Sequence, residues 1–118
     1  MAIQIGKGAK KDLIFRIETD EFVQTDTLLF AIELAEDEET LIMEYSKPVS
    51  EIDIVDGRYN FIVPLNSEFT ITLDETDYLF DLTLIDVYGQ KKPLMKPETI
   101  TIINTVGASI PDNSNGGE

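Results

Sequence analysis

The chemistry open to this chain of 118 residues is limited by the residue types that it lacks. It contains no histidine and no cysteine. An imidazole base, an imidazole or thiolate metal ligand and a cysteine nucleophile are therefore excluded. These groups are the commonest parts of hydrolase and transferase sites. The remaining carboxylates, lysines, tyrosines and hydroxyls form no catalytic pattern, so we expect a protein that is not an enzyme and that uses no cofactor.

Several short segments have the residue types of ligand sites without their spacing. The run "EDEE" at 36–39 offers carboxylates for calcium, but adjacent acids on a turn point apart and no glycine bends the chain around an ion. "GKGAKK" at 6–11 lacks the spacing of a phosphate-binding loop, and "DNSNG" at 112–116 ends before the distal glutamate of an EF-hand loop. Nothing in the sequence sets two carboxylates at the separation that glycoside hydrolysis needs. We expect no metal site.

The charged residues are unevenly distributed along the chain, whose net charge is −14. Residues 1–17 carry a net charge of +3, residues 18–56 carry −12, and residues 57–118 carry −5. So acidic a surface repels phosphate backbones, and we expect no nucleic-acid partner. The scarce lysines are where a contact with an acidic surface would form. The candidate contact residues are Lys91 and Lys92 on one side, and Glu36, Asp37, Glu38 and Glu39 on the other.

This asymmetry predicts head-to-tail association, with the lysines of one copy facing the acidic strands of the next. The simpler alternative is a solvated acidic face and a solvated lysine turn, neither with a partner. No apolar run approaches the roughly 18 residues of a membrane-spanning helix, and the first residues, "MAIQIGKGAKKDL", lack the apolar segment of a secretory signal. We therefore expect synthesis in a cytoplasm and no membrane partner.

Apolar and polar residues alternate with a period of two through most of the chain, which predicts β-strands. The predicted strands lie near residues 3–5, 13–17, 28–34, 41–45, 52–54, 59–63, 78–85 and 99–103. The connections between them are a solvated turn at 35–40, a hairpin at the "DG" of 56–57, and a turn at Gly89 with the paired lysines at its tip. The segment 66–76 is ambiguous. Alternation of Phe69, Ile71 and Leu73 favours a strand, whereas Asn66 with Glu68 could begin a short helical turn.

Seven to nine short strands without a convincing amphipathic helix predict an all-β fold, an immunoglobulin-like antiparallel β-sandwich. "LDETDY" at 73–78 suits a corner between the sheets, where the Tyr78 hydroxyl bonds back to the turn. We expect the sandwich domain at 1–106, and a flexible tail at 107–118 because that segment gathers Gly, Asn, Ser and Pro. The predicted core contains Phe15, Phe30, Ile32, Phe61, Phe80, Leu82 and Ile102.

The succession "RYNFIVP", "NSEFT" and "DYLFDLTLIDVYGQKKPLMKPETITIINTVG" resembles the immunoglobulin-like tail and baseplate accessory proteins of phages and prophages of Gram-positive bacteria. The N-terminal domain of phage baseplate upper proteins is one of them. Their pattern is Y-x-[YF]-D-[LI]-x-[LI], a polar hairpin with glycine, and a strand that ends in V-[TG]. The matching residues are Tyr78, Phe80, Asp81, Leu82, Leu84, Gly89, Val106 and Gly107. The glycine that usually precedes the aromatic strand is absent, because this chain reads "TDY" there.

The resemblance implies a structural role without catalysis. The chain would be an assembly component of a virion, in the tail or baseplate, made in the host bacterial cytoplasm. Its partners would be copies of itself or other virion proteins. A bacterial adhesion or carbohydrate-binding β-sandwich module is the alternative that the residues leave open.

Overall fold

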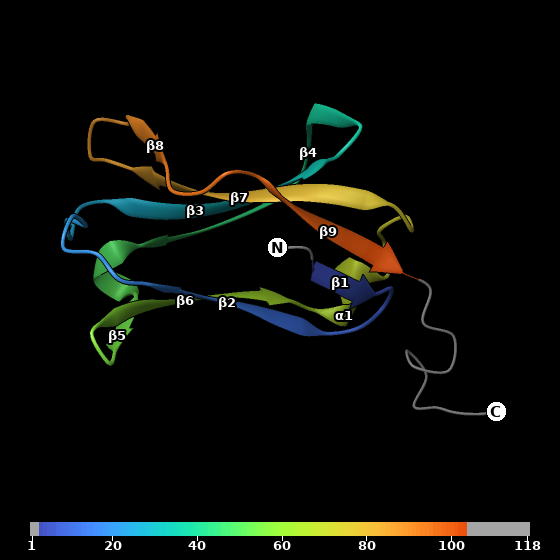
Figure 1. The fold of residues 1–118 in the computed structure, drawn as a ribbon, viewed down its shortest axis with the longest axis horizontal. Helices are drawn as coiled ribbons and strands as arrows, with labels where there is room; N and C mark the ends of the chain where they lie inside the picture. Colours follow the sequence, from blue (N-terminus) through green and yellow to red (C-terminus); the bar gives the residue numbers. More distant parts are fainter. Residues whose placement is uncertain (1–2, 104–118) are drawn as a thin grey trace.

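The computed structural model describes residues 3–103, apart from the side chains of Glu38 and Glu39. Two β-sheets pack face to face (Figure 1), which confirms the prediction of an all-β sandwich. The described residues form nine strands, within the predicted seven to nine. The tail predicted at 107–118 lies outside the described residues.

The larger sheet, sheet A, has the strand order β1-β9-β7-β3-β4, and β8 also pairs with β7. These strands are β1 (Ile3–Gly6), β9 (Glu98–Ile103), β7 (Asp77–Ile85), β3 (Thr27–Leu34), β4 (Asp37–Pro48) and β8 (Lys91–Pro93). The smaller sheet, sheet B, has the order β2-β6-β5, which are Lys11–Ile17, Arg58–Leu65 and Asp53–Val55. All pairs are antiparallel except β1 with β9, which is parallel. A 3-10 turn, η1 (Val49–Glu51), and a one-turn helix, α1 (Ser67–Thr70), each join one sheet to the other.

The core lies between the sheets, where alternate residues of each central strand point inward. Six of the seven predicted core residues are buried: Phe30, Ile32, Phe61, Phe80, Leu82 and Ile102. The seventh, Phe15, is only half-buried. Its ring centroid lies 5.9 Å from that of Phe30 and 6.0 Å from that of Phe80, so the ring does enter the core. Its exposure follows from the position of β2 at the edge of sheet B.

The predicted corner at the start of β7 is confirmed. The Tyr78 hydroxyl donates a hydrogen bond to the backbone carbonyl of Asp74 at 3.1 Å, and the residue is only 3% exposed. Burial is the larger influence on this phenol and raises its pKa. The bond fixes the chain where it crosses from sheet B to sheet A.

The strand favoured for residues 66–76 is wrong, and the helical alternative is right. The Asn66 side chain accepts a hydrogen bond from the backbone N–H of Phe69 at 2.8 Å and so caps α1. The Thr70 hydroxyl donates to the backbone carbonyl of Ala9 at 2.7 Å, which ties α1 to the turn between β1 and β2. Capping and this tertiary contact outweigh the short apolar alternation. As a result the segment does not form a strand, and Ile71 is 54% exposed.

The hairpin predicted at 56–57 is confirmed. Asp56 and Gly57 both have positive φ, 52° and 79°, and they connect β5 to β6. Two such residues give the turn whose twist matches that of the flanking strands.

Candidate interaction surfaces

The turn between β7 and β8 is held in one shape by Asp86. One carboxylate oxygen of Asp86 accepts hydrogen bonds from the backbone N–H groups of Tyr88 and Gln90, both at 2.9 Å. The backbone of Asp86 also donates to the Gln90 carbonyl and accepts from the Gly89 N–H. Gly89 has φ +82°, a conformation that other residues adopt at a cost. The turn predicted at Gly89 is therefore confirmed, and it is rigid.

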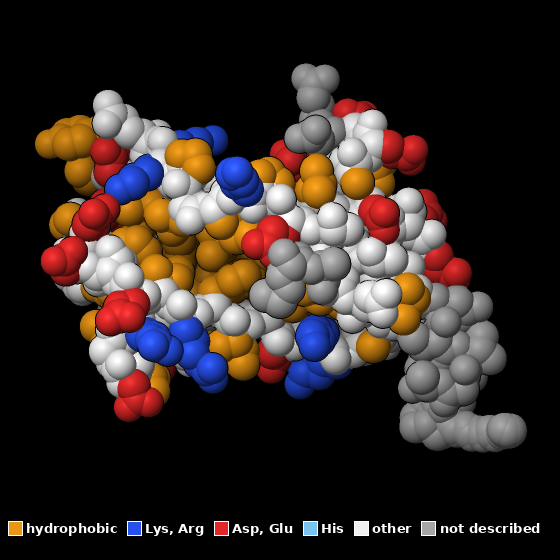
Figure 2. All heavy atoms as spheres, in the orientation of Figure 1, with side chains coloured by type: hydrophobic (Ala, Val, Ile, Leu, Met, Phe, Trp, Pro, Cys, Tyr) orange, Lys and Arg blue, Asp and Glu red, His pale blue; other side chains and the backbone are white. Residues whose placement is uncertain are grey.

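This turn exposes two large apolar side chains. Val87 is 65% exposed and Tyr88 is 87% exposed, the highest values among the large hydrophobic residues of the described chain. Apolar side chains project over this turn at the upper left of Figure 2. The charge pattern indicates only the lysines of this hairpin as contact residues. The sequence "DVYG" also indicates Val87 and Tyr88, because it places an apolar and an aromatic residue between the two turn-forming residues, Asp86 and Gly89.

Lys91 and Lys92 were predicted at the tip of the turn, and this is wrong. They lie in β8, opposite Ile85 and Leu84. The reason is that the Asp86 bonds close the turn by Gln90. The Lys92 amine lies 2.8 Å from a carboxylate oxygen of Glu21, in the connection between β2 and β3. Through this hydrogen bond and the attraction of charges, the pKa of Glu21 falls and that of Lys92 rises.

The acidic run also differs from its prediction. The solvated turn predicted at 35–40 is shorter, since only Ala35 and Glu36 form the turn and β4 begins at Asp37. The Thr40 hydroxyl donates to an Asp37 carboxylate oxygen at 2.7 Å. Register shifts in the pairing of β3 with β4 after Ile32 accommodate the extra residues of β4. We call this end of the β3–β4 pair the acidic hairpin; it contains Glu36 and Asp37, both exposed, and the backbone of Glu38 and Glu39.

The lysines of β8 and the acidic hairpin lie at opposite ends of sheet A. Lys91 pairs with Ile85, which pairs with Thr27 at the start of β3. Asp37 pairs with Leu34 at the end of β3. Seven strand residues separate these levels, a distance of about 24 Å at the usual rise per residue. The structure therefore does not bring the two predicted groups together within one chain (Figure 1).

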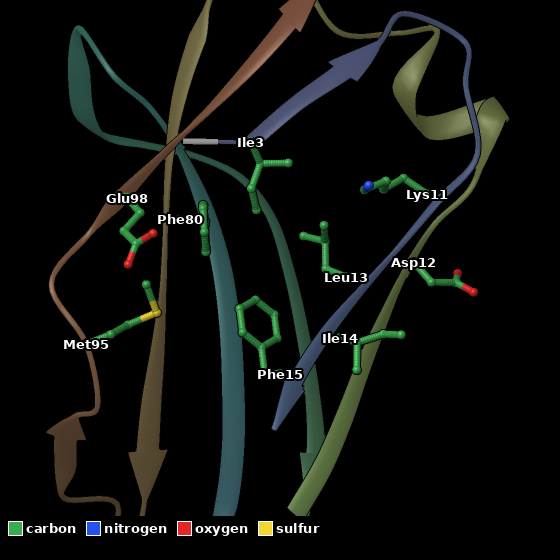
Figure 3. A pocket seen from close by; sticks show the side chains of 9 residues that line it. All are labelled: Ile3, Lys11, Asp12, Leu13, Ile14, Phe15, Phe80, Met95 and Glu98. Atoms are coloured by element: carbon green, nitrogen blue, oxygen red, sulfur yellow. The ribbon is translucent and has the colours of Figure 1, made fainter. Parts of the chain in front are cut away.

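An apolar pocket opens between the sheets on the side where β2 forms the edge of sheet B. Its volume is about 410 Å³. Figure 2 shows apolar side chains in a hollow between the two layers, with charged side chains on its rim. Ile3, Leu13, Phe15 and Phe80 point into it (Figure 3), with Met95 and Glu98 on the opposite wall. No pattern in the sequence indicates this pocket.

The pocket owes its opening to a break in pairing along β7. β8 pairs with residues 83–85 of β7 and β9 pairs with residues 77–80. The Leu94 N–H still donates to the Leu82 carbonyl at 2.9 Å, and the chain from Met95 to Pro97 then leaves the ladder, with a proline at its end. Proline lacks the N–H group that a continuous ladder needs. Asp81 of β7 lies at this break, where partial burial raises the pKa of its carboxyl.

No group of three or more acidic residues within residues 3–103 is arranged to hold a metal ion. In the same range no helix is long and apolar enough to cross a membrane. When the sequence is compared with protein-family models and with curated proteins, none matches it. The resemblance to phage accessory proteins therefore stays a prediction.

Proposed function

We propose that this chain is a non-enzymatic assembly component of a phage or prophage virion, in the tail or baseplate. It works through end-to-end contacts between copies or with other virion proteins. The observation that carries this proposal is the separation along sheet A of the acidic hairpin at one end from Lys91 at the other, where Lys92 is paired with Glu21.

Such a separation suits a repeated contact. The acidic hairpin and the β8 end cannot contact each other within one molecule, but each can contact the other on a second copy. A heterologous contact of this kind builds a ring or a stack. Complementary charges orient the copies and suppress the reverse arrangement, in which like charges would meet. Because Lys92 already bonds to Glu21, Lys91 is the β8 lysine that is available to a second molecule.

The rigid turn beside β8 supports the same proposal. Exposed aromatic residues are frequent anchors of protein interfaces, and a side chain on an ordered turn loses little freedom on binding. Val87 and Tyr88 provide an apolar anchor on the turn that leads into β8 and Lys91. The contact surface would then combine a central apolar anchor with charges at its rim.

The direct test is to look for the chain in particles. Prophage induction in the encoding strain, followed by density-gradient purification, should place the chain in the particle fraction by mass spectrometry. A Tyr88→Ala chain, supplied in place of the natural one, should be depleted from particles although it folds. If the natural chain appears only in the soluble fraction, the virion role is wrong.

The end-to-end contact can be tested on the purified chain by sedimentation velocity. We expect species larger than a dimer at low salt and roughly 1 mM protein. They should dissociate in 1 M NaCl, where charges are screened beyond about 3 Å. Lys91→Glu should abolish them. Lys96→Glu, the same charge change at an exposed position between β8 and β9, should not. Association that strengthens with salt would contradict an electrostatic contact.

A further inference from the structure

A second surface, distinct from the two ends of sheet A, lies along the free edge of β2. Within the described residues, β2 pairs with β6 on one side and with no strand on the other. An edge strand presents unpaired N–H and C=O groups that can accept another strand. The side chains on the outer face at this edge, from Lys10 just before β2 to Glu18 just after it, are all exposed: Lys10, Asp12, Ile14, Arg16 and Glu18.

This row of side chains is complementary to itself when read in the opposite direction. If a second copy of β2 runs antiparallel with Ile14 opposite Ile14, Asp12 of each copy lies opposite Arg16 of the other. Lys10 then lies opposite Glu18 in the same way. Opposite charges that face each other across a strand pair stabilise it, and like charges destabilise it. One register therefore forms four oppositely charged pairs, two of each kind. Within its own chain, Glu18 also lies 3.8 Å from Arg58.

The neighbouring registers do not have this property. A shift by two residues in one direction puts Lys10 opposite Arg16, and a shift by two in the other puts Asp12 opposite Glu18. A shift by one residue would set outward side chains against inward ones. Charges on an edge strand often serve to prevent pairing, but here they favour the central register and oppose the two registers shifted by two residues.

The apolar residues of β2 fit the same register. Leu13 and Phe15, which line the pocket, would lie opposite each other across the two copies, and the added strand would lie along the pocket's open side. On the outer face Ile14 pairs with Ile62 of β6, and they are 51% and 40% exposed. The two copies would join these pairs into one apolar row, Ile62-Ile14-Ile14-Ile62.

We propose that two copies of this chain form a symmetric dimer by antiparallel pairing of their β2 strands, with Ile14 at the two-fold axis. The two three-stranded B sheets then form one continuous sheet, a known mode of strand addition. The contact is isologous and closes at two copies. It is independent of the proposed function, because it uses neither the acidic hairpin nor β8.

Cysteine cross-linking can test the register, because the chain has no cysteine of its own. Directly opposite residues of antiparallel strands have Cα atoms about 4.5–5.5 Å apart, within the range of a disulfide. Ile14→Cys should therefore give a covalent dimer when oxidised glutathione is added. The matched control is Ile62→Cys, at an exposed position whose two copies would lie about 14 Å apart, three strand spacings. Equal cross-linking of the two variants would overturn the proposal.

Charge exchange tests the same register without a new bond. Sedimentation equilibrium of the full chain should show a mass that rises from 13.3 kDa toward twice that value. Asp12→Arg and Arg16→Asp each place like charges opposite one another twice, so each should weaken the dimer by about tenfold or more. The double variant restores opposite charges and should restore the dimer.

Three results would overturn the proposal: a monomeric natural chain at roughly 1 mM, single variants that dimerise like the natural chain, or a double variant no better than the singles. Circular dichroism melting of each variant checks that it folds, which we expect because the substituted side chains are exposed. Lys91→Glu should leave this dimer intact while it abolishes the larger end-to-end species, so either contact can fail alone.

Discussion

Phe15 and Phe61 lie opposite each other on neighbouring strands of sheet B, yet their surroundings differ. Phe61 of β6 is fully buried, and its ring centroid lies 5.9 Å from that of Tyr45 in sheet A. Phe15 of β2 is half-buried and lines the open pocket. The same residue type, at the same level of the same sheet, thus has two environments.

The difference arises in the opposite sheet as much as in sheet B. β6 has a strand on each side, and its Phe61 packs against Tyr45 of β4, which is paired with β3. β2 is an edge, and the pocket that it lines reaches across to Met95, in the segment Met95–Pro97 that leaves β7. One side of the sandwich is therefore closed by paired strands, and the other is closed only in part. This comparison can be tested by substitutions on each side.

The largest effect is expected on the closed side. Phe61→Ala should lower the free energy of unfolding by about 3–5 kcal/mol, because a sealed core cannot fill the space that the ring leaves. Chemical denaturation followed by circular dichroism measures this loss. A loss below about 1 kcal/mol would show that the closed side is not tightly packed.

The same substitution on the open side should cost less. Phe15→Ala should lower the free energy of unfolding by about 1.5–2 kcal/mol, since only part of the ring is removed from water and the vacated space is continuous with the pocket. The same denaturation experiment gives the value. Equal losses for the two phenylalanines would mean that the pocket is closed in solution. Dimer formation through β2 could close it, so the measurement would then be repeated in the Asp12→Arg variant, in which the dimer is weakened.

A smaller effect is expected at the corner that fixes the start of β7. Tyr78→Phe should cost about 1 kcal/mol, because the Asp74 carbonyl loses its hydrogen-bond donor while the ring stays in place. Thermal melting measures the change. Tyr88→Phe removes the same hydroxyl from an exposed ring and serves as the control; if both variants melt alike, the corner bond contributes nothing.

The closed side could be predicted from sequence to a much greater extent than the open side. Alternation in β3, β6 and β7 identifies Phe30, Phe61 and Leu82 as core residues, because both neighbours of these strands enforce the period of two. The same alternation places Phe15 with them, since it carries no information about which strand forms an edge. Nor does it locate the break after Leu94, which depends on how β8 and β9 share one edge of β7.

The interaction surfaces show the same limit. Charge alone identified Lys91, Lys92 and the acidic run as a complementary set, and their separation to opposite ends of sheet A required the strand register. The bond of Lys92 to Glu21 joins residues distant in sequence, which no local pattern indicates. The helical turn at Ser67–Thr70 is different, because its Asn66 cap can be read from the sequence, although the alternation of Phe69, Ile71 and Leu73 favours a strand there.

The smallest effect concerns Asp81, on β7 at the break itself. Partial burial raises the pKa of its carboxyl in the folded state above the unfolded value of about 3.9. The ionised form therefore opposes folding at neutral pH, and this cost disappears once the pH falls below the unfolded value, where both states are protonated. Asp81→Asn should raise the melting temperature at neutral pH, and the gain should vanish at about pH 3.

Removal of any negative charge can stabilise a chain with a net charge of −14, so the comparison needs a control. Asp20→Asn removes one charge at an exposed position outside the strands. The gain of Asp81→Asn at neutral pH should exceed that of Asp20→Asn, because only Asp81 is shielded from water at the break. Equal gains in the two variants, measured by thermal melting at both pH values, would mean that Asp81 is as well solvated as a loop carboxylate. The segment from Met95 to Pro97 would then lie farther from β7 in solution, and the open side of the sandwich would extend beyond the pocket.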